Sequence, residues 1–470
     1  MIVDAVTENI LPDPDEIKAM ENEGFKFSSD YKWLYRAPHT DTVVIPRGVE
    51  VIGRDAFYRH YGLEKVVIPD TVTEIRDRAF TRCENLQELV LPEGLKKIGE
   101  SAFRDCQKLT KVVIPQSVEE MKDSAFGGCS ALSEVVLGSG LTEIGSRAFY
   151  FCSNLSKIVI PPSVTAIGKQ AFENCRNLSG IVIPPGVTEI GKSAFCGCSN
   201  LSGFVIPENI SKIGGSAFRG IPDVIGNAKF QIGEDGLLID VEKNSIISTT
   251  RTLPENYSIP EGISEIGDHA FCGLQSTKIV IPRSITKIGA GAFENSKLIE
   301  VVIPDSVEKI GAGAFENSQL IEVVIPDSIT EIEQGTFAGC RDLQKAVIPA
   351  GVLKIGKNAF WSCDDLPCVF IPETVTEIGE YAFCCCHGLT EIVIPGSVTK
   401  IGESAFQNCK NLTRVIISDG VTEIGDSAFW ICEKLKKAVI PGSVKKIGRF
   451  AFEKTACEED IKQDHPHLFE

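Results

Sequence analysis

Several large residue types that usually contribute to a globular core are rare in this sequence. Its 470 residues include only 3 Met, 3 Trp and 7 Tyr, against 25 Phe. This skew indicates that one aromatic residue is used repeatedly at an equivalent place. No run of about 18 apolar residues occurs, so we expect no membrane insertion. Basic residues are also in deficit, with 47 Lys and Arg against 64 Asp and Glu, a formal net charge of −17. Such an acidic chain does not favour nucleic acid as a partner.

Motifs for targeting and for catalysis are missing as well. Residues 1–15 contain neither the basic nor the apolar segment of a signal peptide, which makes a cytoplasmic location one expectation. The six His do not recur with Ser, Cys or carboxylates in a catalytic pattern. The Gly-Ala-Gly segment at 289–291 is not followed by the Gly-Lys-Ser/Thr of a phosphate loop. We therefore expect no enzyme activity and no cofactor.

What the sequence does contain is a repeat. An Ala-Phe or Thr-Phe pair recurs every 23 residues in a first block and every 22 or 23 residues in a second, which makes seventeen units. Each unit can pack on its neighbours alone, so a solenoid of this length needs no division into several compact cores. The Phe positions are 57, 80, 103, 126, 149, 172, 195, 218, 271, 293, 315, 337, 360, 383, 406, 429 and 452.

One unit has three apolar parts. Residues 89–91 alternate in a way that predicts a short strand, which ends at Pro92 because proline cannot donate to a ladder. Residues 95–98 carry a second apolar pair, and Gly99 ends it. Ala102 and Phe103 form the third, for which we expect a single helical or 3₁₀ turn. Stacked copies can bury all three parts, whereas one copy cannot.

The unit resembles the leucine-rich repeat of the BspA, or Treponema, type, whose pattern is L-x-x-I-x-I-P-x-x-V-x-x-I-G-x-x-A-F-x-x-C. Residues 135–152 and 392–409 follow it closely, and the resemblance covers about residues 41–457. It implies a β-rich superhelix or horseshoe with a parallel sheet of about 17 short strands on the concave side. It also implies a binding protein for a protein or glycan ligand, adhesin-like and at the cell surface or secreted.

Two segments depart from the repeat, and short apolar runs around polar turns predict a β-hairpin in each. We also expect a short helix over residues 13–22 and a disordered tail. The predicted domains are an N-terminal helix plus hairpin cap at 1–40, a first repeat block at 41–218, a hairpin insertion at 219–258, a second repeat block at 259–457 and an acidic tail at 458–470.

The middle residue of each apolar triplet is the candidate for partner binding. Strand alternation turns it away from the core, and an exposed apolar stripe often marks an interaction site. The alternative is that β-branched residues simply favour strands. Aromatic residues that follow the repeated Phe are further candidate anchors. The predicted partner-binding residues are Val113, Val136, Val159, Val182, Val205, Phe370, Tyr150, Trp361 and Trp430.

Cysteines and charges also follow the repeat. Of 17 Cys, eleven occupy one position, which is filled elsewhere by Ser296, Ser318 or His60, so we expect small, buried, free thiols there. The Cys-Cys-Cys-His run at 384–387 does not predict a metal site, because consecutive residues cannot readily surround one Zn²⁺. Charges alternate before successive strands, and we expect them to pair and to fix the register. This column includes Lys65, Glu88, Lys111, Glu134 and Lys157.

The sequence therefore favours a non-enzymatic binding protein with an adhesin-like role. An intracellular interaction scaffold and a structural spacer are the alternatives. A monomer is expected rather than an obligate oligomer.

Overall fold

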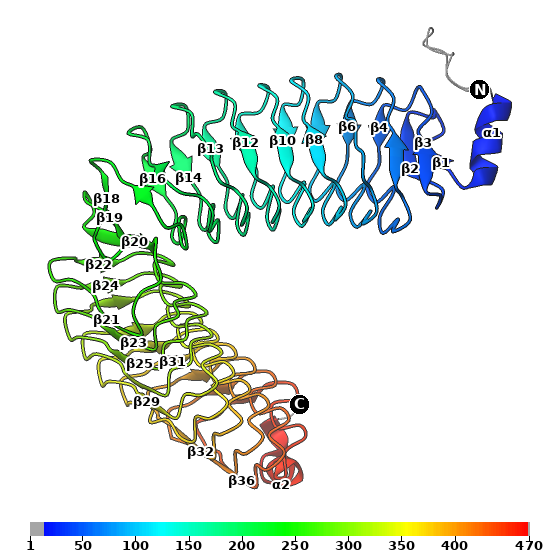
Figure 1. Ribbon diagram of the computed structural model, residues 1–470. Helices are drawn as coiled ribbons and strands as arrows, with labels where there is room; N and C mark the ends of the chain where they lie inside the picture. The colour runs from blue at the N-terminus through cyan, green and yellow to red at the C-terminus, as the bar shows by residue number, and fades with distance from the viewer. Residues whose placement is uncertain (1–13, 469–470) are drawn as a thin grey trace. The chain divides into compact units, whose positions relative to one another are not determined.

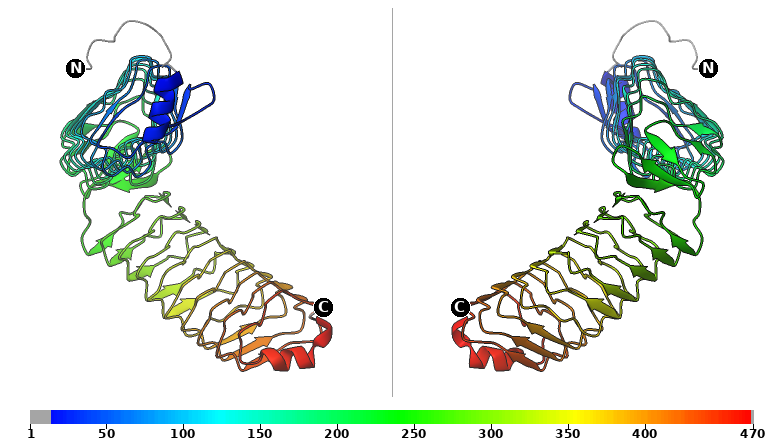
Figure 2. Two further views of the ribbon diagram at one scale, coloured as in Figure 1. Left: turned by 90° about the vertical axis from the view of Figure 1, so that its right-hand side faces the viewer. Right: turned by 90° about the vertical axis from the view of Figure 1, so that its left-hand side faces the viewer.

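The computed structural model describes residues 14–468. The chain divides into two compact units, Met1–Glu234 and Asp235–Glu470. Within each unit, short parallel strands stack coil upon coil, as the ribbon shows (Figure 1). Two further views show the same stacking in each unit (Figure 2). The predicted repeat solenoid is confirmed, with very little helix.

Each coil has three sides, which we name the valine face, the isoleucine face and the phenylalanine corner. The valine face carries strands of two to four residues, such as β8 (Lys111–Val113), whose middle residue Val112 is buried. The isoleucine face carries two-residue strands such as β9 (Glu120–Met121). The corner carries the Ala-Phe pair, and both of its side chains point into the core.

In the first unit, strands on each face pair in parallel with their equivalents in neighbouring coils. The valine face contains β3 (Thr42–Val44), β5 (Lys65–Val67), β8, β10 (Glu134–Val136), β12 (Lys157–Val159), β15 (Phe204–Val205) and β17 (Val224–Ile225). The isoleucine face contains β2 (Trp33–Arg36), β4 (Val51–Ile52), β6 (Glu74–Ile75), β7 (Lys97–Ile98), β9, β11 (Glu143–Ile144), β13 (Ala166–Ile167), β14 (Glu189–Ile190) and β16 (Lys212–Ile213). The remaining strands of this unit are β1 (Lys26–Phe27) and β18 (Phe230–Ile232).

The second unit repeats this arrangement. Its valine face contains β21 (Asn256–Ser258), β23 (Lys278–Val280), β25 (Glu300–Val302), β27 (Glu322–Val324), β29 (Lys345–Val347), β32 (Glu391–Ile394), β34 (Arg414–Ile417) and β36 (Lys437–Val439). Its isoleucine face contains β20 (Ser245–Thr249), β22 (Glu265–Ile266), β24 (Lys287–Ile288), β26 (Lys309–Ile310), β28 (Glu331–Ile332), β30 (Lys354–Ile355), β31 (Glu377–Ile378), β33 (Lys400–Ile401), β35 (Glu423–Ile424) and β37 (Lys446–Ile447).

The ladder of the valine face is interrupted, so the expected row of about 17 strands is divided among several short sheets. Residues 89–91, 181–183 and 369–371 follow the same course without a regular strand. Isolated bridges still join Lys65 to Glu88 and Lys157 to Gly180. The chain therefore keeps its register across two of these breaks.

The phenylalanine corner is not the helical or 3₁₀ turn that we expected. The residues two before and two after each of the seventeen Phe have a left-handed backbone, for example Ser101 (φ 56°) and Asp105 (φ 60°). Alternate N–H groups therefore point along the solenoid. Those of Ser101, Phe103 and Asp105 each donate to a carbonyl of the next coil over 2.8 Å. In a helical turn, these N–H groups would instead have donated to carbonyls of their own coil.

The core is a stack of equivalent side chains. Phe103 and Phe126 have ring centroids 5.1 Å apart and an interplanar angle of 7°. Such a pair contributes about 0.5–1.5 kcal/mol beyond its area burial. The repeated cysteines are buried and free, as predicted. The structure adds that their S–H groups act as donors, as Cys129 does to the carbonyl of Phe103 at 3.1 Å.

Hairpins are found where the sequence predicts them. In the first unit, α1 (Pro14–Glu23) precedes β1 (Lys26–Phe27), which pairs antiparallel with β2. In the second unit, β19 (Leu237–Asp240) pairs antiparallel with β20. The second strand of each hairpin then pairs in parallel with the next strand of its isoleucine face, β2 with β4 and β20 with β22.

The expectation of a disordered tail is wrong. Residues 458–468 form α2 (Glu458–Asp464), drawn in red in Figure 2, and the 3₁₀ helix η1 (Pro466–Leu468). Ile461 and Leu468 are buried in these two elements. At the earlier corners of the second unit the equivalent N–H donates to the next coil, whereas the N–H of Lys454 donates to Oε2 of Glu458 over 2.9 Å. The tail orders because it covers apolar surface and satisfies this donor.

Candidate binding surface

The predicted valines lie on the outside of the valine face. Val113, Val136 and Val159 are aligned in the register of β8, β10 and β12. Their exposure rises from 46% and 44% at the first two to 75% at Val159, and it reaches 80% at Val182. Val205 follows in β15 and is exposed as well. The apolar stripe is therefore a property of the folded surface in the first unit.

A border of charged side chains runs beside this stripe and then stops. Nζ of Lys111 lies 2.8 Å from a carboxylate oxygen of Glu134, and Lys65 pairs with Glu88 at 3.5 Å. The positions that follow Lys157 hold Gly180 and Gly203. These two sites therefore place no charged side chain beside the neighbouring valines. We call Val159, Val182 and Val205 the apolar patch.

Phe370 occupies the same column in the second unit, where it is also strongly exposed. Its border position is held by Cys368, an exposed free thiol, instead of a charged residue. It thus shares the local arrangement of the apolar patch but belongs to the other compact unit.

The predicted aromatic anchors do not lie on the valine face. Tyr150, Trp361 and Trp430 each follow a core Phe and lie at the phenylalanine corner. Trp361, which is 39% exposed, and Tyr381 border a hollow of about 670 Å³. The other lining residues are Ala312, Gly313, Glu316, Gln334, Gly335, Ala338, Lys357 and Asn358.

Glycine opens this hollow. Gly313 and Gly335 have left-handed backbones at the position two before the Phe, where most coils carry a side chain. The sequence signal for the hollow is this recurrence of glycine at equivalent positions of neighbouring units. Tyr381 is held beside Nζ of Lys357, 5.8 Å from the ring centroid, and that nitrogen lies 2.7 Å from Glu380. The hollow therefore combines aromatic faces with charged and amide groups.

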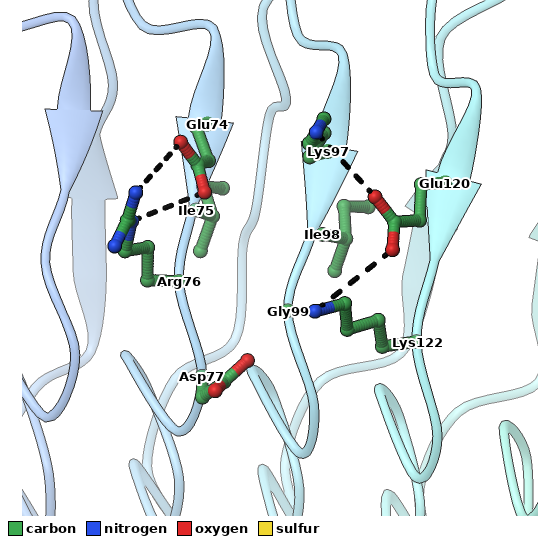
Figure 3. Close-up of a pocket in the computed structure, with 9 residues that line it drawn as sticks. All are labelled: Glu74, Ile75, Arg76, Asp77, Lys97, Ile98, Gly99, Glu120 and Lys122. Carbon is green, nitrogen blue, oxygen red and sulfur yellow. Dashed lines mark hydrogen bonds and ion pairs between the residues drawn. The ribbon is translucent and has the colours of Figure 1, made fainter.

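The isoleucine face also carries a hollow, of about 210 Å³, but its side chains pair with one another (Figure 3). Arg76 contacts Glu74 at 3.1 Å, and Glu120 lies 3.7 Å from Nζ of Lys97 and 3.9 Å from that of Lys122. Exposed pairs of this kind contribute about 0.2–1 kcal/mol each. The Lys97–Glu120 pair joins neighbouring coils and supports the register, as the alternating charges predicted, whereas the other two pairs each lie within one coil.

The cysteine-rich run near residue 385 is part of a polar network that the sequence did not predict. Nδ1 of His387 lies 2.7 Å from Oδ1 of Asp364, and Nδ2 of Asn408 lies 3.4 Å from Nε2 of the same ring. The Asn408 amide also donates to Sγ of Cys385 over 3.3 Å. Hydrogen bonds from Cys384 and Asn408, together with the charge of His387, lower the pKa of Cys385 to about 6. The partners come from neighbouring coils, 23 residues away along the chain.

Over residues 14–468, no helix is long and apolar enough to cross a membrane. The comparison with curated proteins finds no significant match. Among solved structures, the chain is similar to a leucine-rich cell surface protein from Faecalibacterium prausnitzii, with 27% identity, 84% of this chain and 92% of the other covered, and a TM-score of 0.43. It is also similar to the Treponema pallidum leucine-rich repeat protein, with 30% identity, coverages of 39% and 89%, and a TM-score of 0.36.

The sequence model of the BspA type leucine rich repeat region matches residues 31–144, 97–225, 250–367 and 354–463. These matches include nearly all of the coils described above. The chain belongs to the BspA-type leucine-rich repeat family.

Proposed function

We propose that this chain is a non-enzymatic binding protein that recognises a protein partner through the apolar patch of its first unit. The observation that carries the proposal is the end of the charged border at Gly180 and Gly203 while the valine column continues. A monomeric protein gains nothing for its own core from Val182 at 80% exposure. A patch of this kind is typical of protein interaction sites.

The charge of the chain restricts the partner. With a net charge of −17, the chain attracts basic surfaces over long range and repels acidic ones. We therefore propose a partner whose contact surface is apolar at the centre and basic at the rim. A cell-surface or secreted location, with an adhesin-like role, is the setting that the family resemblance implies.

The test compares two double variants of the full chain. Val159→Asp with Val182→Asp places charge in the apolar patch. Val302→Asp with Val324→Asp places the same charge in the same column of the second unit, beside the border residues Glu300 and Glu322. All four valines are exposed, so both variants are expected to fold, which circular dichroism checks.

A partner is captured from surface extracts with the unaltered chain, identified, purified and measured against each variant by biolayer interferometry. We expect the first variant to lose at least about tenfold in affinity, or about 1.4 kcal/mol, and the second to bind normally. Equal binding by all three chains would place the interaction away from the patch and overturn the proposal.

A second binding role is favoured by the hollow at Trp361. Aromatic faces beside amide and carboxylate groups are suited to sugars, which present both C–H surfaces and hydroxyl groups, so we propose a glycan as its ligand. The hollow offers Trp361, Tyr381, Glu316, Gln334 and Asn358. A glycan array should show binding that Trp361→Ala abolishes and Trp430→Ala retains. Loss in both variants, or in neither, would refute this role.

A further inference from the structure

A cluster of three side chains with metal-binding atoms lies at the phenylalanine corner of the second unit, apart from both surfaces described above. His269, Cys272 and Glu294 each offer one ligand atom, and these atoms all lie within 4.8 Å of one another. Nδ1 of His269 is 3.0 Å from Oε2 of Glu294. The three residues are partly buried, so an ion from solvent can reach them.

The repeat itself brings two of these side chains together. Cys272 and Glu294 each follow the core Phe of their coil, so they occupy equivalent positions one coil apart, a spacing of about 4.8 Å. The N–H of Phe271 donates to the carbonyl of Ala292 over 2.8 Å, and that of Gly273 to the carbonyl of Glu294 over 2.7 Å. These bonds fix the backbones that carry the two ligands.

A glycine allows the third side chain to join them. His269 lies three residues before Cys272, and its imidazole leans over the next coil, where Gly291 holds the equivalent position. A Cβ on Gly291 would lie 2.2 Å from Nδ1 of His269, well inside contact distance. Most other coils have a side chain at this position, for example Ser101, Ser124 and Ser193. The cluster therefore depends on a local feature of this coil.

We propose that His269, Cys272 and Glu294 bind one Zn²⁺ ion. One nitrogen, one sulfur and one oxygen suit this borderline ion, which takes all three ligand types in tetrahedral sites, whereas Ca²⁺ and Mg²⁺ require oxygen ligands. Zinc–ligand bonds of about 2.0–2.3 Å place tetrahedral ligand atoms about 3.3–3.7 Å apart, a value that lies between the 3.0 Å separation of His269 and Glu294 and the 4.8 Å limit of the cluster. Binding releases the thiol proton of Cys272 to solvent. The fourth position is left for water or for a side chain of a bound partner.

The experiment uses the full chain without a histidine tag, stripped of metal by a chelator and titrated with Co²⁺ as a spectroscopic probe. A thiolate-to-cobalt charge-transfer band should grow to one equivalent and disappear when Zn²⁺ is added. Metal analysis should then find one zinc per chain. Cys272→Ser should abolish the band and weaken Zn²⁺ binding by at least about tenfold, the smallest loss usually seen when even an outer partner of a metal site is removed.

Three further variants test whether the band arises from this cluster. Gly291→Ser keeps all three ligands but displaces the imidazole, so it should also remove the band. Gly335→Ser is the matched control, because a Cβ there meets nothing closer than 3.9 Å. Cys385→Ser tests the other thiol and imidazole pair and should leave the band intact. Absence of stoichiometric binding, survival of the band in Cys272→Ser, or its loss in Cys385→Ser would overturn the proposal.

Discussion

Lys157 and Gly180 are partners in an isolated parallel bridge, and the charged border of the valine face ends between them. A Cβ on Gly180 would meet no atom within 4 Å, so this position can accept a side chain. We predict that Gly180→Lys restores the border and weakens partner binding by about tenfold, because the ammonium group must be desolvated in the contact. Biolayer interferometry with the purified partner measures this effect.

Gly62→Lys is the matched control for that substitution. It adds the same charge in the same unit, at another glycine whose added Cβ meets nothing within 4 Å. Its affinity should equal that of the unaltered chain. A similar loss in both lysine variants would show that overall charge, and not the border, determines binding.

His60 makes the first coil sensitive to acid. It is buried at the position that other coils fill with cysteine, and burial together with the nearby His39 lowers its pKa to about 4. The unfolded chain, with a pKa near 6.5, takes up the proton first, so stability falls as the pH drops from about 6.5 to about 4, by up to about 3 kcal/mol. Denaturant unfolding of His60→Cys at pH 7.5 and pH 4.5 should show a smaller loss than the unaltered chain. Equal losses would contradict this assignment.

Ile431 is a β-branched residue in a left-handed conformation, with φ of 60°. Asparagine holds the equivalent corner position at Asn174, Asn295 and Asn317, and it tolerates this backbone better. We predict that Ile431→Asn stabilises the chain by about 1 kcal/mol, measured as a rise in the unfolding midpoint. The reverse change, Asn174→Ile, should lower the midpoint. Stabilisation by both would rule out backbone strain as the cause.

Cys385 should react with iodoacetamide well below the pH at which ordinary thiols do. With a pKa of about 6, its alkylation rate is expected to reach half of its maximum near pH 6, since only the thiolate reacts. Asn408→Gly removes one stabilising donor and keeps a residue suited to the left-handed backbone, so it should move this midpoint upward. Peptide mass spectrometry follows each site, and exposed Cys368 reports on access of the reagent. An unchanged midpoint in the variant would exclude the role of Asn408.

The sequence predicts the coils well because each apolar position recurs at a fixed interval and is buried at the same place in every coil. Phe103 and Cys129 are buried where the repeat puts them. The backbone conformation of the phenylalanine corner is harder to predict. Residues such as Ser101 and Asp105 are compatible with a helical turn, and only the hydrogen bonds that their N–H groups donate to the next coil distinguish the two conformations. The order of the tail is not predicted, because its composition is mostly charged and only two of its apolar residues, Ile461 and Leu468, are buried.

The site is less predictable than the coils for a related reason. The outward course of Val159 and Val182 follows from strand alternation. The 80% exposure of Val182 coincides with the break in the regular strand at residues 181–183, which the repeat pattern does not predict. The network of Cys385 joins Asp364 and Asn408 from the coils on either side. The cluster at His269 requires a glycine in the next coil. Each of these features arises from a difference between individual repeats, and a consensus pattern does not contain such differences.

The one-way hydrogen bonds of the phenylalanine corner give the second unit two unlike ends. At every interior corner of this unit, alternate N–H groups donate to the following coil, and the carbonyls between them accept from the preceding one. A coil can therefore be added or lost between two others without creating a mismatch, which makes duplication of whole repeats structurally neutral at this corner. Self-association by stacking would have to join a donor end to an acceptor end, and Glu458 already occupies a donor of the final coil. The polarity that permits the array to lengthen within one chain would also permit head-to-tail polymerisation between chains, and the hydrogen bond to Glu458 opposes this at the final coil.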